Sequence, residues 1–433
     1  MSHRWIHARR ALSAFVFATV LAACSGGSGS TDAADASGGP GASVDAGTSG
    51  VDARAASVHD EVSAARVTTS EPPTAPPVPY RRKVPMRAPV AVPAAFVGLH
   101  THRWPGASAT PSYGYGTARS HNYFGDDSSL GLLWYAINTA DGVYDWTRMD
   151  RWVETNHAAG KRLIYTVYGT PAWCASDTRV KDPYHQPGGD SRPRDLGCVS
   201  RFVDALVRRY NAGPTRRIQL IEIWNEPNFE GYVYWRDSAS DLAALGRSVY
   251  RAAKAADPGI KVLWPAFVEW YTAPVVWKDN LAYGNAPDGA GGVGKDWADG
   301  FAFHFYGYNT GMDDLMDNQE SALKTLAALG KPQWQTWNTE IGMGDGWGRT
   351  QSAEVQAQLI RRWLALSAAY GNQVAALYAH DSENLGYPDR NPVTAAAIDE
   401  AHRRLAGKTI REAGVLQDGR VWIVFGDNST WAI

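Results

Sequence analysis

The chain has 433 residues, of which 44% are hydrophobic and 20% are charged, and its formal net charge is −2. This length and composition can bury one large globular core. Lys and Arg form no block beyond residues 81–83, so the chain lacks the clustered basic face that nucleic-acid binding requires.

The N-terminus is predicted to be an export signal that leads to a lipid anchor. A basic start precedes an apolar run from 11 to 23, which is too short to span a bilayer but fits a secretory signal. The run ends in Leu-Ala-Ala-Cys, which resembles the lipobox of bacterial lipoproteins. The resemblance implies a signal peptide at 1–23, acylation of Cys24 and, because Ser25 follows, an outer-membrane location. The alternative is an ordinary signal peptide cleaved near Ala23.

Residues 24–92 are expected to form a disordered tether between the lipid and the folded domain. The segment is rich in Ala, Ser, Gly, Asp, Thr and Pro and has few large apolar side chains. Such a segment cannot bury enough apolar surface to offset the entropy lost on ordering.

From residue 93 to 410 the sequence alternates short apolar runs with amphipathic helical patterns. The runs predicted as strands lie at 96–100, near 132–134, and at 162–168, 217–223, 261–264, 300–306, 332–340 and 374–380. About eight strands that alternate with helices predict an α/β fold, the (β/α)8 TIM barrel. A doubly wound sheet is the alternative, but no glycine-rich phosphate loop follows the first strand. Residues 411–433 are expected to form a short β segment packed on the barrel.

The chain has three cysteines, and a lipid anchor would use Cys24. In an exported protein, Cys174 and Cys198 can form a disulfide that closes a loop of roughly 25 residues. Two free, buried thiols are the alternative.

The strand expected at 217–223 ends in a group of polar side chains. Its β-branched run is typical of a strand buried on both faces, and Pro227 must end it because proline cannot donate to a ladder. Asn225 and Glu226 therefore stand at the C-terminal end of a barrel strand, where catalytic groups lie. Glu222 occurs earlier in the same run and is expected to pair inside the barrel.

A second carboxylate, Glu340, ends the strand expected at 332–340, and His304 and Tyr306 end the one at 300–306. Two carboxylates on opposed strands, with aromatic residues around them, suit glycoside hydrolysis. One carboxyl group protonates the leaving oxygen while the other attacks the anomeric carbon or activates water.

These motifs resemble those of glycoside hydrolase clan A, and most closely family 39 and related bacterial exopolysaccharide glycosidases. The resemblance rests on Ile-Trp-Asn-Glu-Pro-Asn at 223–228, on Thr-Trp-Asn-Thr-Glu at 336–340, and on the segments 142–146 and 168–173. It implies a retaining mechanism in which Glu226 is the general acid/base and Glu340 the nucleophile, without a cofactor.

The resemblance also implies roles for the surrounding residues. Asn225 would hydrogen-bond the substrate 2-hydroxyl, a contact that strengthens in the transition state. Tyr306 would hydrogen-bond Glu340, and Arg119 would hold Glu340 ionised, while a drier site raises the pKa of Glu226. The remaining candidates for substrate binding are His304, Trp173, His100, Trp337 and His380.

We therefore expect a monomeric, lipid-anchored retaining β-glycosidase that acts on an extracellular or periplasmic polysaccharide. A non-catalytic carbohydrate-binding lipoprotein that holds a glycan during export is the alternative, and a structural envelope protein is a third interpretation. No metal is expected, because His100 and His102 have the spacing of metal ligands but no third ligand is evident. Sugar binding or packing is the preferred interpretation of these two histidines.

Overall fold

The structure is a computed structural model that describes residues 75–102, 111–120, 131–229, 234–269, 273–344 and 347–433. The expected signal peptide, the lipidation site Cys24 and the tether up to residue 74 lie outside the described residues. In the described ranges, no helix is long and apolar enough to cross a membrane.

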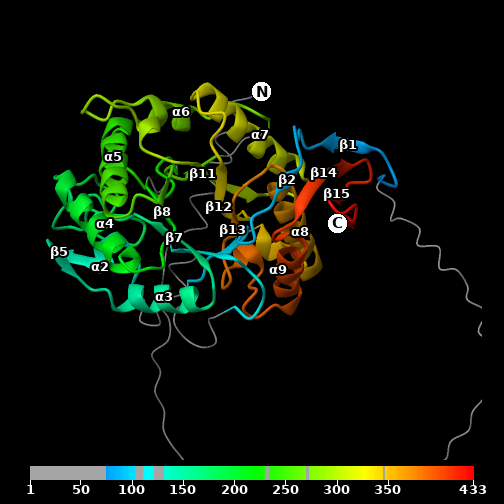
Figure 1. The fold of residues 1–433 in the computed structure, drawn as a ribbon, viewed down its shortest axis with the longest axis horizontal. Helices are drawn as coiled ribbons and strands as arrows, with labels where there is room; N and C mark the ends of the chain where they lie inside the picture. Colours follow the sequence, from blue (N-terminus) through cyan, green and yellow to red (C-terminus); the bar gives the residue numbers. More distant parts are fainter. Residues whose placement is uncertain (1–74, 103–110, 121–130, 230–233, 270–272, 345–346) are drawn as a thin grey trace, which may run out of the picture.

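Parallel strands form one sheet that closes into a barrel (Figure 1). In spatial order they are β10 (Phe267–Val268), β11 (Phe301–Gly307), β12 (Thr336–Met343), β13 (Ala375–Leu377), β3 (Val97–Leu99), β4 (Thr117–Ser120), β7 (Arg162–Thr166), β8 (Leu220–Glu222) and β9 (Lys261–Leu263). β9 and β10 are two halves of one interrupted strand, and a parallel bridge from Leu263 to Gly300 closes the ring. The eight strand positions that result confirm the predicted (β/α)8 fold.

Helices surround this barrel (Figure 1). They are α2 (Trp134–Ile137), α3 (Thr147–Ala158), α4 (Leu196–Asn211), α5 (Ala239–Ala256), α6 (Lys278–Asn285), α7 (Asp313–Ala328), α8 (Ala353–Ala369) and α9 (Pro392–Leu405), with 3-10 turns at Gly294–Asp296, Gly348–Thr350 and Glu383–Leu385. Local signals set their ends: Ser238 and Asp241 form a capping box at the start of α5. A small hairpin, β5 (Asn138–Ala140) and β6 (Val143–Tyr144), precedes α3.

The second barrel strand differs from the expectation. The apolar run at 132–134 leads into α2, and the second strand is β4, which carries Arg119. All four residues of β4 are buried although three of them are polar. Its polar groups are satisfied inside the barrel, as when the Thr117 hydroxyl donates to the Ala95 carbonyl oxygen at 2.5 Å. A short polar strand has no hydrophobic periodicity, so the sequence pattern did not predict it.

A second, antiparallel sheet packs beside α8 and joins both ends of the described chain (Figure 1). It contains β1 (Tyr80–Lys83), β2 (Val90–Ala91), β14 (Thr409–Leu416), β15 (Val421–Phe425) and β16 (Thr430–Ala432), and β14 pairs with β1, β2 and β15. The expected boundaries therefore need correction. β1 and β2 lie inside the stretch assigned to the tether, and β14 begins before residue 411.

Contacts that are distant in sequence hold β1 in place. Arg82 forms ion pairs with Asp317 at 2.7 Å and Glu320 at 2.8 Å on α7, and Val84 and Val92 are buried. Because the partner strand and the partner helix both lie far along the chain, the local composition of this segment could not reveal its order.

The loop between β7 and α4 is closed by a disulfide between Cys174 and Cys198, one of the two alternatives that the cysteine count allowed. Gly188, with φ of +82°, lets the loop fold tightly, because a Cβ there would collide with Ala175. In the chain-entropy model, closing a loop of this length contributes about 3 kcal/mol. The bridge therefore holds this loop close to the C-terminal end of β7.

Candidate active site

Glu226 is positioned by the backbone at the C-terminal end of β8. Its φ of +41° lies in the left-handed region, which non-glycine residues seldom adopt. Its N–H donates to the Ala266 carbonyl oxygen at 2.8 Å. Just beyond it, the Asn228 amide donates to the Val268 carbonyl oxygen at 2.8 Å and accepts from the Val268 N–H at 3.1 Å. These bonds to the next barrel strand fix the unusual backbone of Glu226.

Trp224, which precedes Asn225 in the motif, has a structural role. It is fully buried, and its Nε1 donates to the Tyr234 carbonyl oxygen at 2.7 Å. Its ring meets Tyr168 and Trp235 edge-on, at centroid distances of 5.1 and 5.0 Å. The indole therefore anchors the strand end that presents Glu226.

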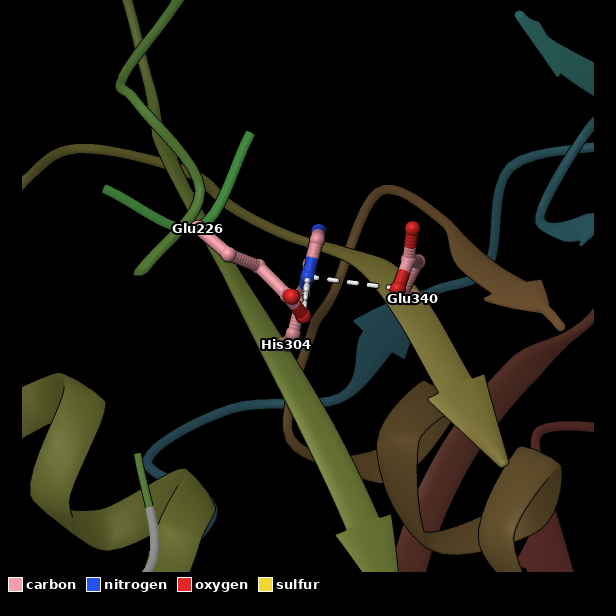
Figure 2. Close-up of side chains that lie close together, drawn as sticks. All are labelled: Glu226, His304 and Glu340. Carbon is pink, nitrogen blue, oxygen red and sulfur yellow. Dashed lines mark hydrogen bonds and ion pairs between the residues drawn. The ribbon is translucent and has the colours of Figure 1, made fainter. Parts of the chain in front are cut away.

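Glu340 approaches Glu226 from the other side of His304 (Figure 2). His304 Nδ1 lies 2.7 Å from Glu226 Oε1 and 3.4 Å from Glu340 Oε2. An oxygen of each carboxylate and the His304 nitrogen all lie within 4.8 Å of one another. His304 is fully buried and contacts both carboxylates. An approach of the two carboxylate oxygens to within 4.8 Å agrees with the short spacing, about 5–5.5 Å, of a nucleophile and an acid.

Arg119 on β4 connects this pair to the barrel interior. Its side chain has no exposed surface. Nη1 donates to Glu340 Oε1 at 2.8 Å, Nε donates to Glu222 Oε2 at 2.8 Å, and Nη2 donates to Asn225 Oδ1 at 2.9 Å. The expected proximity of Arg119 and Glu340 is present, and Glu222 pairs inside the barrel as predicted.

The electrostatic balance at Glu340 differs from the expectation. Burial raises the pKa of Glu340 above its ordinary value, while the Arg119 guanidinium and the Tyr306 hydroxyl, 2.7 Å from Oε2, act to lower it. Glu222 adds to the rise. One guanidinium shared by two buried carboxylates does not offset the desolvation of Glu340. The hydrogen bond from Tyr306 is therefore important for keeping Glu340 ionised.

Partly exposed tyrosines surround the carboxylates, and the sequence analysis named only Tyr306 among them. The rings of Tyr306 and Tyr378 meet edge-on, with centroids 6.3 Å apart. Burial raises the pKa of Tyr184, and the nearby charges of Glu340 and Glu226 add to this rise. The place of Tyr378 directly after β13 is a signal that could have identified it. Tyr184 lies in the disulfide-closed loop, where the sequence had no comparable signal.

Two expected substrate-binding residues, His100 and Trp337, are buried among other parts of the chain. His100 is fully buried, and its Nε2 lies 2.9 Å from the Thr339 carbonyl oxygen, so it supports the backbone of β12. Trp337 packs against Gly300, where a Cβ would collide with the indole, and Lys261 Nζ lies 5.4 Å from its ring centroid. Both neighbours of Trp337 lie at the N-terminal ends of the barrel strands, away from the carboxylates. Packing is the role of both side chains.

His380 and Trp173, the other two residues expected to bind substrate, lie in different surroundings. His380 is buried, and its Nδ1 lies 2.7 Å from the Tyr113 hydroxyl. Its neighbour Asp381 pairs with His102 at 3.2 Å. These contacts make His380 part of the barrel rim. Trp173, in contrast, is partly exposed and lines a hollow next to the β7 strand end.

Within the described residues, Glu226, His304 and Glu340 also offer three atoms that could ligate a small divalent cation. No metal is expected from the sequence. His304 Nδ1 already forms a hydrogen bond with Glu226 and lies within ion-pair distance of Glu340, so the arrangement has a chemical explanation in the two carboxylates and the imidazole alone.

No family model matches this chain, and no curated protein matches its sequence. Several solved structures are similar to this chain in fold. A monomeric β-xylosidase from Caulobacter crescentus CB15 has a TM-score of 0.58 at 19% identity, covering 78% of this chain and 75% of that chain. The GH39 enzyme from Xanthomonas axonopodis pv. citri has a TM-score of 0.55 at 19% identity, covering 78% and 73%. A GH30 endoxylanase from Clostridium papyrosolvens C71 has a TM-score of 0.52 at 13% identity, covering 79% and 81%.

The chain shares the fold of family 39 glycoside hydrolases. At these identities the likeness establishes the fold, and it agrees with the resemblance of the strand-end motifs to clan A. A chemical role for the two carboxylates has to be argued from their positions and contacts, not from this likeness of fold.

Replacing Arg119 by Met should lower the free energy of unfolding by about 3–5 kcal/mol, because Glu222 and Glu340 would remain buried without a cation. Arg119 acts to lower the pKa of Glu340, so its removal raises that pKa further. The folded variant then takes up a proton at Glu340, and the loss should be smaller at about pH 5 than at pH 7. Urea unfolding at both pH values measures this. Arg208→Met, which removes an exposed pair with Asp204, is the control and should not change stability. An equal loss in the two variants would contradict the role of Arg119.

Proposed function

We propose that the protein is a retaining β-glycosidase that cleaves a polysaccharide by double displacement. The observation that carries this proposal is that one carboxylate oxygen of Glu226 and one of Glu340 lie within 4.8 Å of each other, on either side of His304. Inverting enzymes need about 6.5–9.5 Å between the two carboxyl groups to admit a water molecule, whereas retaining enzymes need about 5–5.5 Å.

In the first step, Glu340 attacks the anomeric carbon while Glu226 donates its proton to the leaving oxygen. Tyr306 and Arg119 donate to Glu340, which orients the nucleophile and favours its ionised form. In the second step, Glu226 takes a proton from water, which attacks the same carbon and releases Glu340 as a carboxylate. Asn225, held by Arg119, is positioned to hydrogen-bond the 2-hydroxyl.

A screen of glycoside substrates would identify the sugar that the enzyme cleaves. The similar structures include a β-xylosidase and an endoxylanase, so β-xylosides and xylan are the first substrates to test. The exopolysaccharide of the producing organism is the second, with sizing of the products to separate endo from exo cleavage.

We further propose that the enzyme is exported and lipid-anchored, with the outer membrane as its site. The apolar run at 11–23, the lipobox-like Cys24 and the tether rich in small residues support this proposal. A tether would let the barrel reach a polymer at a distance from the membrane.

Glu340→Gln should lower kcat on any cleaved substrate by at least about 10⁴-fold, because the nucleophile is lost. Glu226→Gln should still form the glycosyl-enzyme from a nitrophenyl glycoside, whose leaving group needs no proton. Azide should then restore turnover, because it attacks without a general base, and NMR should show a β-glycosyl azide. An α product, or full activity of Glu340→Gln, would overturn the assignments. Sugar binding without hydrolysis by the wild type would favour the non-catalytic alternative.

Tyr306→Phe tests the hydrogen bond to the nucleophile. Since the hydroxyl lowers the pKa of Glu340, its removal should raise that pKa and move the acid limb of the kcat/KM profile to higher pH. We expect kcat/KM at neutral pH to fall about tenfold or more, the effect of losing a hydrogen bond to a charged group. An acid limb that stays in place would show that Tyr306 does not act on Glu340.

Cys24→Ala should release the full chain from membranes, because acylation requires the thiol. Detergent-free fractionation of the producing cells measures the distribution, with Arg208→Met, a surface substitution that keeps Cys24, as the control. If Cys24→Ala remains in the membrane fraction, the anchor lies elsewhere.

A further inference from the structure

We propose that the hollow beside the disulfide-closed loop is a subsite for a neutral sugar unit, one that lies away from the cleaved bond. The inference rests on the proposed glycosidase function and deepens it, because it implies a substrate longer than a disaccharide. The hollow has a volume of about 360 Å³, within the range of ligand sites. Its lining includes Tyr135, Trp173, Pro171, Pro187, Gln186 and Thr139.

Trp173 is held in place by a hydrogen bond and remains partly exposed. Its Nε1 donates to the Asn138 carbonyl oxygen at 2.8 Å, so the indole is tied to the β5 strand of the neighbouring hairpin. The next residue, Cys174, is fixed by the disulfide. An indole that is fixed at its polar edge and partly open to solvent suits stacking on the C–H face of a pyranose ring.

Tyr135 contributes a second ring to the hollow. The ring can take its position only because Gly169 has no side chain. Gly169 has φ of +85°, and a Cβ on it would collide with the Tyr135 ring. The Tyr135 N–H donates to the Gly169 carbonyl oxygen at 3.2 Å, so the two residues are in contact twice. The close approach of this ring to the end of β7 forms part of the wall of the hollow.

One short turn of the chain connects the hollow to the surroundings of the two carboxylates. Asp182 Oδ1 accepts from the N–H of Tyr184 at 2.9 Å and from the N–H of Gln186 at 2.8 Å. Tyr184 lies close enough to Glu226 and Glu340 to feel their charges, whereas Gln186 lines the hollow. Two residues span at most about 7 Å of chain, so a glycan could extend from the carboxylates to the hollow.

The chemistry of the lining indicates what kind of sugar it would accept. The lining residues that the structure describes carry no charged side chain, and they combine two aromatic rings and two prolines with an amide and a hydroxyl. An anionic uronic acid would find no cation there to replace its lost hydration. The hollow therefore fits a neutral glycosyl unit.

Binding to a catalytically inactive chain tests this subsite separately from hydrolysis. In the Glu340→Gln background, calorimetry with xylohexaose, cellohexaose and mannohexaose should show at least one ligand whose Kd weakens about tenfold with Trp173→Ala, a loss of about 1.4 kcal/mol. Trp173→Phe keeps an aromatic face and should retain most of the affinity. Val143→Ala, an exposed position on the same hairpin, is the control and should bind like the parent.

The possible outcomes distinguish a failure of the proposed subsite from a failure of the proposed glycosidase function. Equal affinity in Trp173→Ala and Trp173→Phe, or no binding of any hexasaccharide, would overturn the subsite. Binding that depends on Trp173 without hydrolysis by the wild type would overturn the proposed glycosidase and leave the subsite standing. Hydrolysis whose kcat/KM does not rise from the disaccharide to the hexasaccharide would also count against the subsite.

Discussion

The guanidinium of Arg119 is the interaction on which the C-terminal end of the barrel depends. It is buried without exposed surface and donates to Glu222, Glu340 and Asn225 at once. Three strand positions, those of β4, β8 and β12, thereby meet at one cation. A buried cation of this kind is stable only while all its partners are present, so it couples the integrity of the barrel to the geometry of the candidate active site.

Near this cation, an unfavourable backbone conformation is held in place by hydrogen bonds. The left-handed backbone of Glu226 is unfavourable by itself, and hydrogen bonds from Glu226 and Asn228 to the neighbouring strand hold it. His304 lies between the two carboxylates, and Tyr306 donates to Glu340. In a buried site each of these bonds is electrostatically stronger than in water. The result is a rigid arrangement that holds one carboxylate on each side of His304.

The walls of the site come from parts of the chain that the barrel strands do not determine. The loop closed by Cys174 and Cys198 places Tyr184 near the carboxylates, and Trp173, which directly precedes Cys174, lines the adjoining hollow. Its conformation depends on the disulfide, on Gly188 and on the hydrogen bonds that Asp182 accepts. The proposed subsite therefore depends on this loop, whereas the positions of the two carboxylates depend on the barrel strands.

The sequence by itself determined the barrel and the pair Glu226 and Glu340, because strand periodicity and the residues that end a strand are local properties. It also indicated that Glu222 pairs within the barrel. Only the tertiary structure decided that Trp337 packs away from the site and that β1 belongs to a sheet with β14. It alone revealed how burial outweighs the guanidinium at Glu340. These outcomes depend on partners distant in the sequence and on the loss of water around a charge, neither of which a local pattern contains.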